Sequence, residues 1–264
     1  MADAGGRVNI ERRGPIASVV LDRPERHNAM SLTMWNALAG ACESLAADRD
    51  VRCVILRGKG EQAFVSGADI GEFETLRADP EAARRYDQLT LRSFEAIAGL
   101  EVPVLAAIHG YCVGGGVAIA LECDLRYAAD DAVFAIPAAR LGLGYGLDLL
   151  RTALHVLGPS ATKELVFSAQ RFRADAAERF GLLNRVFPKP ELDASVEEIA
   201  VRIAENAPLT LRAAKRALRE LLRPPAEADL AGAQRAIDAC FNSADYGEGV
   251  RAFLEKRAPR FTGR

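Results

Sequence analysis

The chain has 264 residues, half of them apolar and 27% charged, which suits one globular domain or one domain with a helical extension. Its formal net charge is -2 and it has no basic block, so nucleic acid is not expected as a partner. Five scattered cysteines and three histidines disfavour a disulfide framework and a metal site. Met1–Arg7 lacks the apolar core of a signal peptide, and no uncharged apolar run could cross a membrane. We therefore expect a soluble cytoplasmic protein.

Strands and helices are predicted to alternate over the first two-thirds of the chain. Short strands are predicted over residues 8–12, 16–21, 53–56, 104–108, 125–128 and 133–136. Helices are predicted from the N-cap Ser31 to Ala47, over 80–97 and 117–122, and from about Leu147 onward. This order indicates an α/β fold with a largely parallel sheet.

The last quarter of the chain is predicted to be helical throughout. Helices expected over 201–220 and 226–241 have too few apolar residues to hold a core of their own. We therefore divide the chain into a core, residues 1–199, and a C-terminal helical region, residues 200–264. This second region must pack on the core or on another subunit.

Gly114, Gly115 and Gly116 follow a predicted strand and open a predicted helix. A helix start presents unpaired N–H groups, and glycine lets a ligand approach that backbone closely. The segment therefore suits an anion or a developing oxyanion. It lacks the lysine of a P-loop and the spacing of a dinucleotide fingerprint. The alternative is a tight turn in which glycine only avoids a clash.

A second glycine loop, residues 64–70, reads Phe-Val-Ser-Gly-Ala-Asp-Ile. The two loops together resemble the oxyanion hole of the crotonase (enoyl-CoA hydratase/isomerase) family. Further segments with the same resemblance, in the family's order, are residues 21–30, 102–107, 123–126 and 248–257. The resemblance implies a crotonase-like spiral of ββα repeats with a C-terminal helical trimerisation region. It also implies a homotrimer or hexamer, and an acyl-CoA thioester substrate with no separate cofactor.

The resemblance also implies roles for residues in the glycine loops. The N–H groups of Ser66 and Gly115 would hold the thioester oxygen and stabilise an enolate. Asp69 is expected to cap the helix that follows it. The remaining loop contacts to the acyl-CoA would come from Gly67, Ala68 and Ile70.

Coenzyme A itself would be held by residues outside those loops. By the same resemblance, Arg26 would meet its phosphates, with Ala29 beside it. Phe253 and Lys256 would reach the coenzyme A bound to a neighbouring subunit.

Two catalytic glutamates of the family's hydratases are replaced here by Ala118 and Ala138. Hydration needs a base to activate water and an acid to protonate the α-carbon. Each such group contributes about 10² to 10⁴ in rate. Ordinary hydration therefore requires a substitute for these groups.

Four residues are candidates for the substitute, each with a structural alternative. Tyr145 and Asp148 lie in the loop that lines the acyl pocket in the family. Tyr145 could instead pack with its hydroxyl bonded to the backbone, and Asp148 could cap a helix. Glu122 lies one turn beyond Ala118 and could instead pair with an arginine such as Arg126. His109 could instead order the glycine loop.

The expected function is that of an acyl-CoA-processing enzyme of the enoyl-CoA hydratase/isomerase family. An acyl-CoA decarboxylase is the alternative enzyme, since loss of CO₂ from a malonyl-type thioester needs no general base. A catalytically weak acyl-CoA-binding protein is the alternative outside catalysis.

Overall fold

The computed structural model describes residues 5–264, so most of Met1–Arg7, the segment judged not to be a signal peptide, lies outside the described residues. Six strands form the main sheet in the order β1-β2-β3-β5-β7-β10. Their bounds are β1 Arg7–Arg13, β2 Ile16–Asp22, β3 Cys53–Gly58, β5 Val104–Ile108, β7 Leu125–Ala129 and β10 Arg185–Phe187. Only the β1–β2 pair is antiparallel, which confirms the largely parallel sheet.

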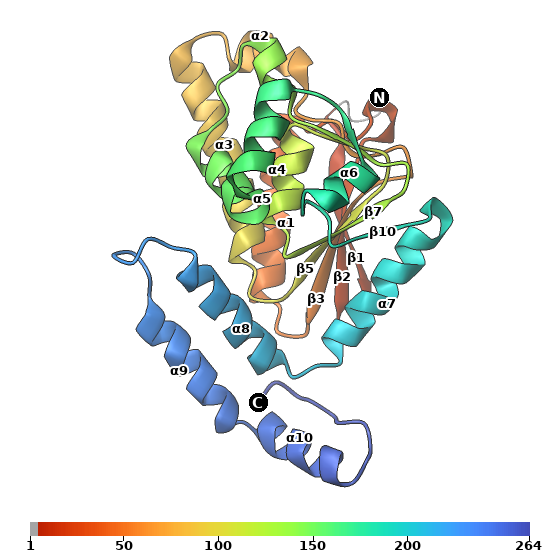
Figure 1. Ribbon diagram of the computed structural model, residues 1–264, viewed down its shortest axis with the longest axis vertical. Helices are drawn as coiled ribbons and strands as arrows, with labels where there is room; N and C mark the ends of the chain where they lie inside the picture. The colour runs from red at the N-terminus through yellow and green to blue at the C-terminus, as the bar shows by residue number, and fades with distance from the viewer. Residues whose placement is uncertain (1–4) are drawn as a thin grey trace.

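A second sheet has four short strands in the order β4-β6-β8-β9. Their bounds are β4 Ala63–Val65, β6 Tyr111–Val113, β8 Val133–Ala135 and β9 Phe172–Arg173. Each of β3, β5 and β7 in the main sheet (Figure 1) is followed along the chain by one strand of the second sheet and then by a helix. This succession is the expected spiral of ββα repeats.

Helices surround the two sheets and continue into the C-terminal region. Their bounds are α1 Leu32–Ala47, α2 Phe73–Leu76, α3 Pro80–Gly99, α4 Gly115–Glu122, α5 Leu147–Ser168, α6 Ala174–Arg179, α7 Leu192–Ala204, α8 Pro208–Leu221, α9 Leu230–Phe241 and α10 Ala244–Leu254. Ser31 caps α1 as predicted, because its hydroxyl accepts the N–H of Met34.

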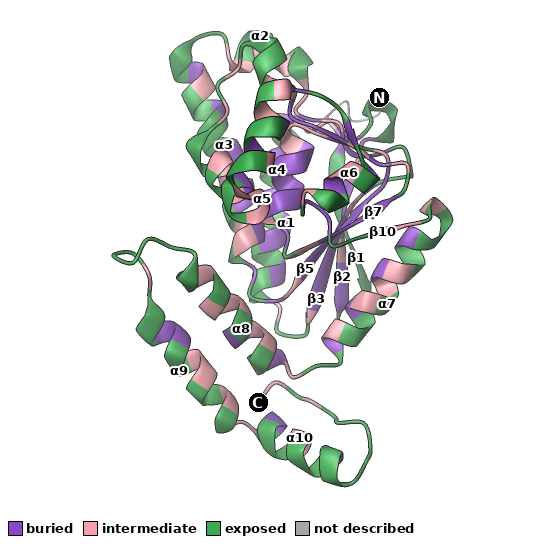
Figure 2. Cartoon of the chain, in the orientation of Figure 1, coloured by how far each residue is buried: buried purple, intermediate pink, exposed green. Residues whose placement is uncertain are grey.

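Apolar side chains cover both faces of the main sheet. On one face, Trp35 of α1 and Phe94 of α3 meet edge to face in the larger cluster. On the other face, α7 packs Leu192, Val196 and Ala200 against the strands. Because both faces are covered, β3 and β5 are buried along nearly their whole length (Figure 2).

Two predicted helix bounds are wrong in the C-terminal quarter. The helix expected over 201–220 is two helices, since α7 ends at Ala204 and α8 begins at Pro208. Proline lacks the N–H that would continue α7, and it suits the first position of a new helix. The helix expected from Ala226 begins only at Leu230, because the side chain of Asp229 caps it by accepting the N–H of Gly232. Helix α7 spans the boundary set at residue 200, and the two-region division stays a prediction.

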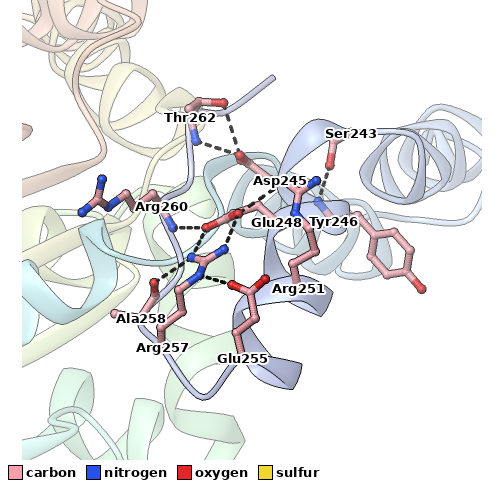
Figure 3. A network of polar contacts seen from close by, with 10 residues as sticks. All are labelled: Ser243, Asp245, Tyr246, Glu248, Arg251, Glu255, Arg257, Ala258, Arg260 and Thr262. Atoms are coloured by element: carbon pink, nitrogen blue, oxygen red, sulfur yellow. Dashed lines mark hydrogen bonds and ion pairs between the residues drawn. The ribbon is translucent and has the colours of Figure 1, made fainter.

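Helices α8, α9 and α10 extend away from the α/β core (Figure 1). Much of these three helices is exposed (Figure 2). Their exposed large apolar side chains include Leu218, Leu221 and Phe253. Acidic residues of α10 fasten the tail that follows (Figure 3). The Asp245 carboxylate accepts hydrogen bonds from the backbone N–H groups of Thr262 and Gly263. The Glu248 carboxylate accepts a hydrogen bond from the Arg257 guanidinium. Across residues 5–264, no helix is long and apolar enough to cross a bilayer.

Candidate active site

A pocket of about 410 Å³ lies where the glycine loop of residues 64–70, the start of α4 and the loop before α5 meet. It is mostly apolar, and the sequence-predicted residues on its wall are Ser66, Gly67, Ala68, Ile70, Gly115, Ala138, Tyr145 and Asp148. The two glycine loops, about fifty residues apart in the chain, are thus brought to one cavity. The parallel pairing of β4 with β6 causes this, because each loop leaves the same end of one of these strands.

Each glycine at the start of α4 has its own structural reason. Gly114 has a φ of 54°, which favours glycine. A Cβ on Gly115 would lie 3.1 Å from the Trp35 ring. A Cβ on Gly116 would lie 2.4 Å from the carbonyl oxygen of Val65, so only glycine lets α4 pack this closely on β4.

The backbone N–H of Ser66 is already used, which corrects its expected role as an oxyanion donor. It donates to the carbonyl oxygen of His27 at 3.1 Å. On either side of Ala68, the Gly67 carbonyl accepts from Met30, and the Asp69 N–H donates to the Met30 carbonyl. The N–H of Ala68 makes no backbone hydrogen bond within residues 5–264.

Ala68 and Gly115 are neighbours across the pocket wall. The nitrogen of Ala68 lies 3.9 Å from the position a Cβ on Gly115 would take. Gly115 is the first residue of α4, so its N–H has no partner within the helix. The structure therefore brings together two backbone N–H groups, those of Ala68 and Gly115, that make no backbone hydrogen bond within residues 5–264. The sequence did not single out the N–H of Ala68, because the Met30–Ala68 bridge that leaves it unpaired is a long-range contact.

Asp69 caps the 3₁₀ turn that follows it, as expected, by accepting the N–H of Gly71 at 3.0 Å. The Asp69 carboxylate also accepts a hydrogen bond from Arg23 Nη1 at 2.7 Å, and this bond is the main reason that the pKa of Asp69 is lowered. Arg23 is buried and also donates to the carbonyl oxygen of Ala29. The arginine of this loop that stays exposed is Arg26, next to Ser66, whose hydroxyl donates to the Arg26 carbonyl at 3.3 Å.

Phe253 and Lys256 are not brought to this pocket. Phe253 lies in the last turn of helix α10 with 83% of its surface exposed, and Lys256 lies in the exposed turn that follows the helix. Phe253 instead lines an apolar groove between α8, α9 and α10.

Ala118 and Ala138 lie differently with respect to the pocket. Ala138 is on the wall, whereas Ala118 is 2% exposed and packs in the core.

In the described chain, the carboxylates on the pocket wall are Asp87 and Asp148. Asp87 is paired with Arg77. Asp148 is exposed, and its carboxylate lies 3.7 Å from Arg151.

Neither the backbone hydrogen bond suggested for Tyr145 nor the helix cap suggested for Asp148 is found. Within residues 5–264 the buried hydroxyl oxygen of Tyr145 has no hydrogen-bond partner, so it is not bonded to the backbone. Asp148 is not the cap of α5, because that position is Gly146. Both residues face the pocket, and burial raises the pKa of the Tyr145 hydroxyl.

The alternative for Glu122, an ion pair with Arg126, is wrong. Glu122 does not pair with Arg126, which donates to the carbonyls of Leu182 and Cys123. Glu122 instead accepts the hydroxyl of Thr152 at 2.9 Å. Burial, and secondarily the charge of Asp148, raise the pKa of Glu122 to about 7.

His109 points away from the glycine loop. Its Nε2 lies 2.9 Å from Asp193 on α7, and it is absent from the pocket wall. His109 directly follows β5, and its side chain reaches α7 on the other face of the main sheet.

The fold and the pocket define the class of protein: a ββα spiral with backbone N–H donors at the mouth of an apolar cavity, which is the crotonase fold. The family model described as "Enoyl-CoA hydratase/isomerase" matches residues 11–264. The chain therefore belongs to the enoyl-CoA hydratase/isomerase family, a family of enzymes.

Relatives and solved structures agree with this assignment. The chain is 34% identical to the short-chain-enoyl-CoA hydratase of Clostridium acetobutylicum over 95% of each chain. It is 33% identical to the crotonyl-CoA hydratase of Syntrophomonas wolfei over 96% of each. A crystal structure titled as an enoyl-CoA hydratase/carnithine racemase from Magnetospirillum magneticum is 39% identical. It superimposes with a TM-score of 0.92, covering 97% of this chain and 96% of its own.

Proposed function

We propose that this protein binds an acyl-CoA thioester and stabilises the enolate formed from it. The observation that carries the proposal is the pair of N–H groups at Ala68 and Gly115, side by side on the wall of an apolar pocket. The thioester oxygen becomes an oxyanion when electrons move onto it. Two fixed donors in a cavity poor in water stabilise that charge more than they stabilise the neutral carbonyl.

The helix start adds to the effect of the two donors. The N-terminus of α4 lies on the pocket wall at Gly114 and Gly115 and carries the positive end of the helix dipole. The short helix extends from the pocket wall into the core, where its side chains are nearly all buried. A rigid donor does not need to reorganise as the charge develops.

Coenzyme A would lie along the exposed side of the loop that carries Arg26, next to the glycine loop of residues 64–70. Arg26 is exposed there and close enough to Asp69 for its charge to contribute to the lowered pKa of that carboxyl. It therefore suits a phosphate at the pocket entrance. A trimer or hexamer would let Phe253 and Lys256 reach coenzyme A on a neighbouring subunit and cover the apolar residues of α8–α10. We expect the protein to act in the cytoplasm.

Decarboxylation is the second candidate reaction, and the apolar surroundings of the donor pair favour it. Ala138 lines the wall where the family's hydratases have a glutamate. A substrate carboxylate held there would be desolvated, which raises its energy and favours loss of CO₂. The third candidate is a catalytically weak protein that binds acyl-CoA without turning it over.

One mass-spectrometric experiment separates these candidates. The purified protein is incubated with crotonyl-CoA and methylmalonyl-CoA together, and both thioesters are followed. A gain of one water by crotonyl-CoA would support hydration, and loss of CO₂ from methylmalonyl-CoA would support decarboxylation. Tight acyl-CoA binding without turnover on a wide panel of thioesters would support the binding protein. If no acyl-CoA binds, the proposal is overturned.

A further inference from the structure

Three ionisable side chains from different elements gather on one side of the pocket. Glu122 is the last residue of α4, Tyr145 lies in the loop before α5, and Asp148 lies in the first turn of α5. The charge of Asp148 contributes to the raised pKa of Glu122, and the charge of Glu122 contributes to the raised pKa of Tyr145. Glu122 lies outside the pocket wall, Tyr145 and Asp148 lie on it, and the Thr152 hydroxyl of α5 holds the Glu122 carboxylate at 2.9 Å.

Tyr145 is the member of the cluster that can touch a bound thioester. It lines the pocket together with Ala68, Gly115 and Ala138. Its hydroxyl is buried and lacks a hydrogen-bond partner among the described residues. A buried hydroxyl without a partner carries a free-energy penalty of about 1–3 kcal/mol, so such a group is often reserved for a ligand.

Glu122 ends α4, the helix that also carries Gly115, and it lies outside the pocket wall. The Thr152 hydroxyl is 2.9 Å from its carboxylate and orients it. The groups that shift its pKa are Thr152 and Asp148, and burial is the largest cause. With a pKa of about 7, the carboxyl can take up or release a proton near neutral pH.

We propose that Glu122 and Tyr145 form one proton relay to the α-carbon of the bound thioester, in place of the glutamates that are missing at positions 118 and 138. This inference rests on the proposed binding of an acyl-CoA at Ala68 and Gly115. Tyr145 is the catalytic residue of the relay, and Glu122 acts through it.

The relay step balances without another reactant. The Glu122 carboxylate takes the proton of the Tyr145 hydroxyl through one bridging water, while the phenol oxygen takes a proton from the α-carbon. The electron pair of that C–H bond becomes the enolate, whose oxygen accepts the N–H groups of Ala68 and Gly115. Protonation of the enolate reverses each transfer.

The neighbouring thiol does not compete for this proton. Cys112 is fully buried beside Tyr145, and burial raises its pKa well above the ordinary value. It therefore stays neutral at the pH at which Glu122 titrates. Asp148 is the negative charge facing Glu122, and the described contacts of the Glu122 carboxyl include no cation.

The relay is tested with butyryl-CoA in D₂O, because a saturated thioester can exchange its α-hydrogens but can neither add water nor lose CO₂. Mass spectrometry follows deuterium uptake as a function of pH. The wild-type rate is expected to rise with pH through about 7 and then level off, since ionised Glu122 is the form that accepts the proton. Glu122→Gln and Tyr145→Phe should each slow exchange by roughly 10²-fold or more, with unchanged butyryl-CoA binding.

Two further variants distinguish the relay from a merely structural role. The Thr152 hydrogen bond lowers the pKa of Glu122 and the Asp148 charge raises it. Thr152→Val should therefore move the midpoint of the pH profile upward, and Asp148→Asn should move it downward. A residue that only packs the pocket would change the rate without moving the midpoint in opposite directions.

The outcomes separate the relay from the proposed function. Exchange that persists in Glu122→Gln with the wild-type midpoint overturns the relay and leaves the oxyanion site intact. A wild-type protein that binds butyryl-CoA without exchanging its α-hydrogens also overturns the relay. If butyryl-CoA does not bind, or if Gly115→Pro exchanges as fast as wild type, the proposed function itself fails, and the relay fails with it.

Discussion

The backbone N–H of Ser66 donates to the carbonyl oxygen of His27 at 3.1 Å. This bond joins the loop after β2 to the loop after β4, and it removes Ser66 from the set of free donors. Two residues further on, the N–H of Ala68 is left without a backbone acceptor in the described part of the chain, next to the first residue of α4. The proposed oxyanion site therefore consists of Ala68 and Gly115.

Amide NMR with a bound enolate analogue tests this assignment. We expect the amide protons of Ala68 and Gly115 to move downfield when the analogue binds, because a charged acceptor forms a shorter hydrogen bond. The Ser66 amide should move little, since it keeps its bond to His27. A downfield shift at Ser66 with none at Ala68 would restore Ser66 as the donor.

Replacing Gly115 with proline is expected to lower turnover by about 10²- to 10³-fold, because it removes one oxyanion donor. Proline is tolerated at the first position of a helix, so α4 should still form.

Gly115→Ala is the matched control for this variant, measured by steady-state kinetics beside it. It keeps the N–H but adds the same Cβ, which would lie 3.1 Å from the Trp35 ring. Equal losses in the two variants would assign the effect to crowding against Trp35 and not to the donor.

Two glycine-to-alanine substitutions should change stability in opposite directions. Gly116→Ala places a Cβ 2.4 Å from the Val65 carbonyl oxygen, and we expect destabilisation of about 1–3 kcal/mol or more from this overpacking. Gly40 lies on the exposed side of α1 with nothing within 4 Å of an added Cβ. Gly40→Ala should therefore stabilise the protein by about 1 kcal/mol. Thermal unfolding at one protein concentration measures both, and a lower Tm for Gly40→Ala would contradict the second expectation.

The tail after α10 should loosen as the pH falls. Hydrogen bonds from Arg257 and from the N–H of Arg260 lower the pKa of Glu248 from 4.5 to about 2. Because the folded-state pKa is the lower one, the stabilisation is fully present above about pH 4.5 and is lost as the pH falls through about 2.

Glu248→Gln tests this linkage. The variant should unfold at a lower Tm than wild type at pH 7, and the difference should shrink as the pH is lowered from 4.5 toward 2. Hydrogen exchange of residues 255–264 gives a local readout of the same change. A Tm difference that does not depend on pH would mean that the Glu248 charge does not hold the tail.

Local patterns in the sequence determined much of the architecture. The β-branched run at residues 53–56 and the serine cap before α1 set a strand and a helix, because strand propensity and N-capping depend on neighbouring residues. The order of the motifs identified the family and the two glycine loops of the pocket. The break before Pro208 was also readable in principle, since proline favours a helix start.

Only the tertiary structure decided which groups at the site are free to act. Ser66 and Ala68 are both ordinary residues of one loop, and the long-range bonds to His27 and Met30 determine which N–H group stays unpaired. Glu122 seemed placed to pair with Arg126 four residues away, but packing of α4 against α5 gives it Thr152 as its partner and a raised pKa. Hydrogen bonding and burial of this kind depend on contacts between residues far apart in the chain, which a local pattern does not contain.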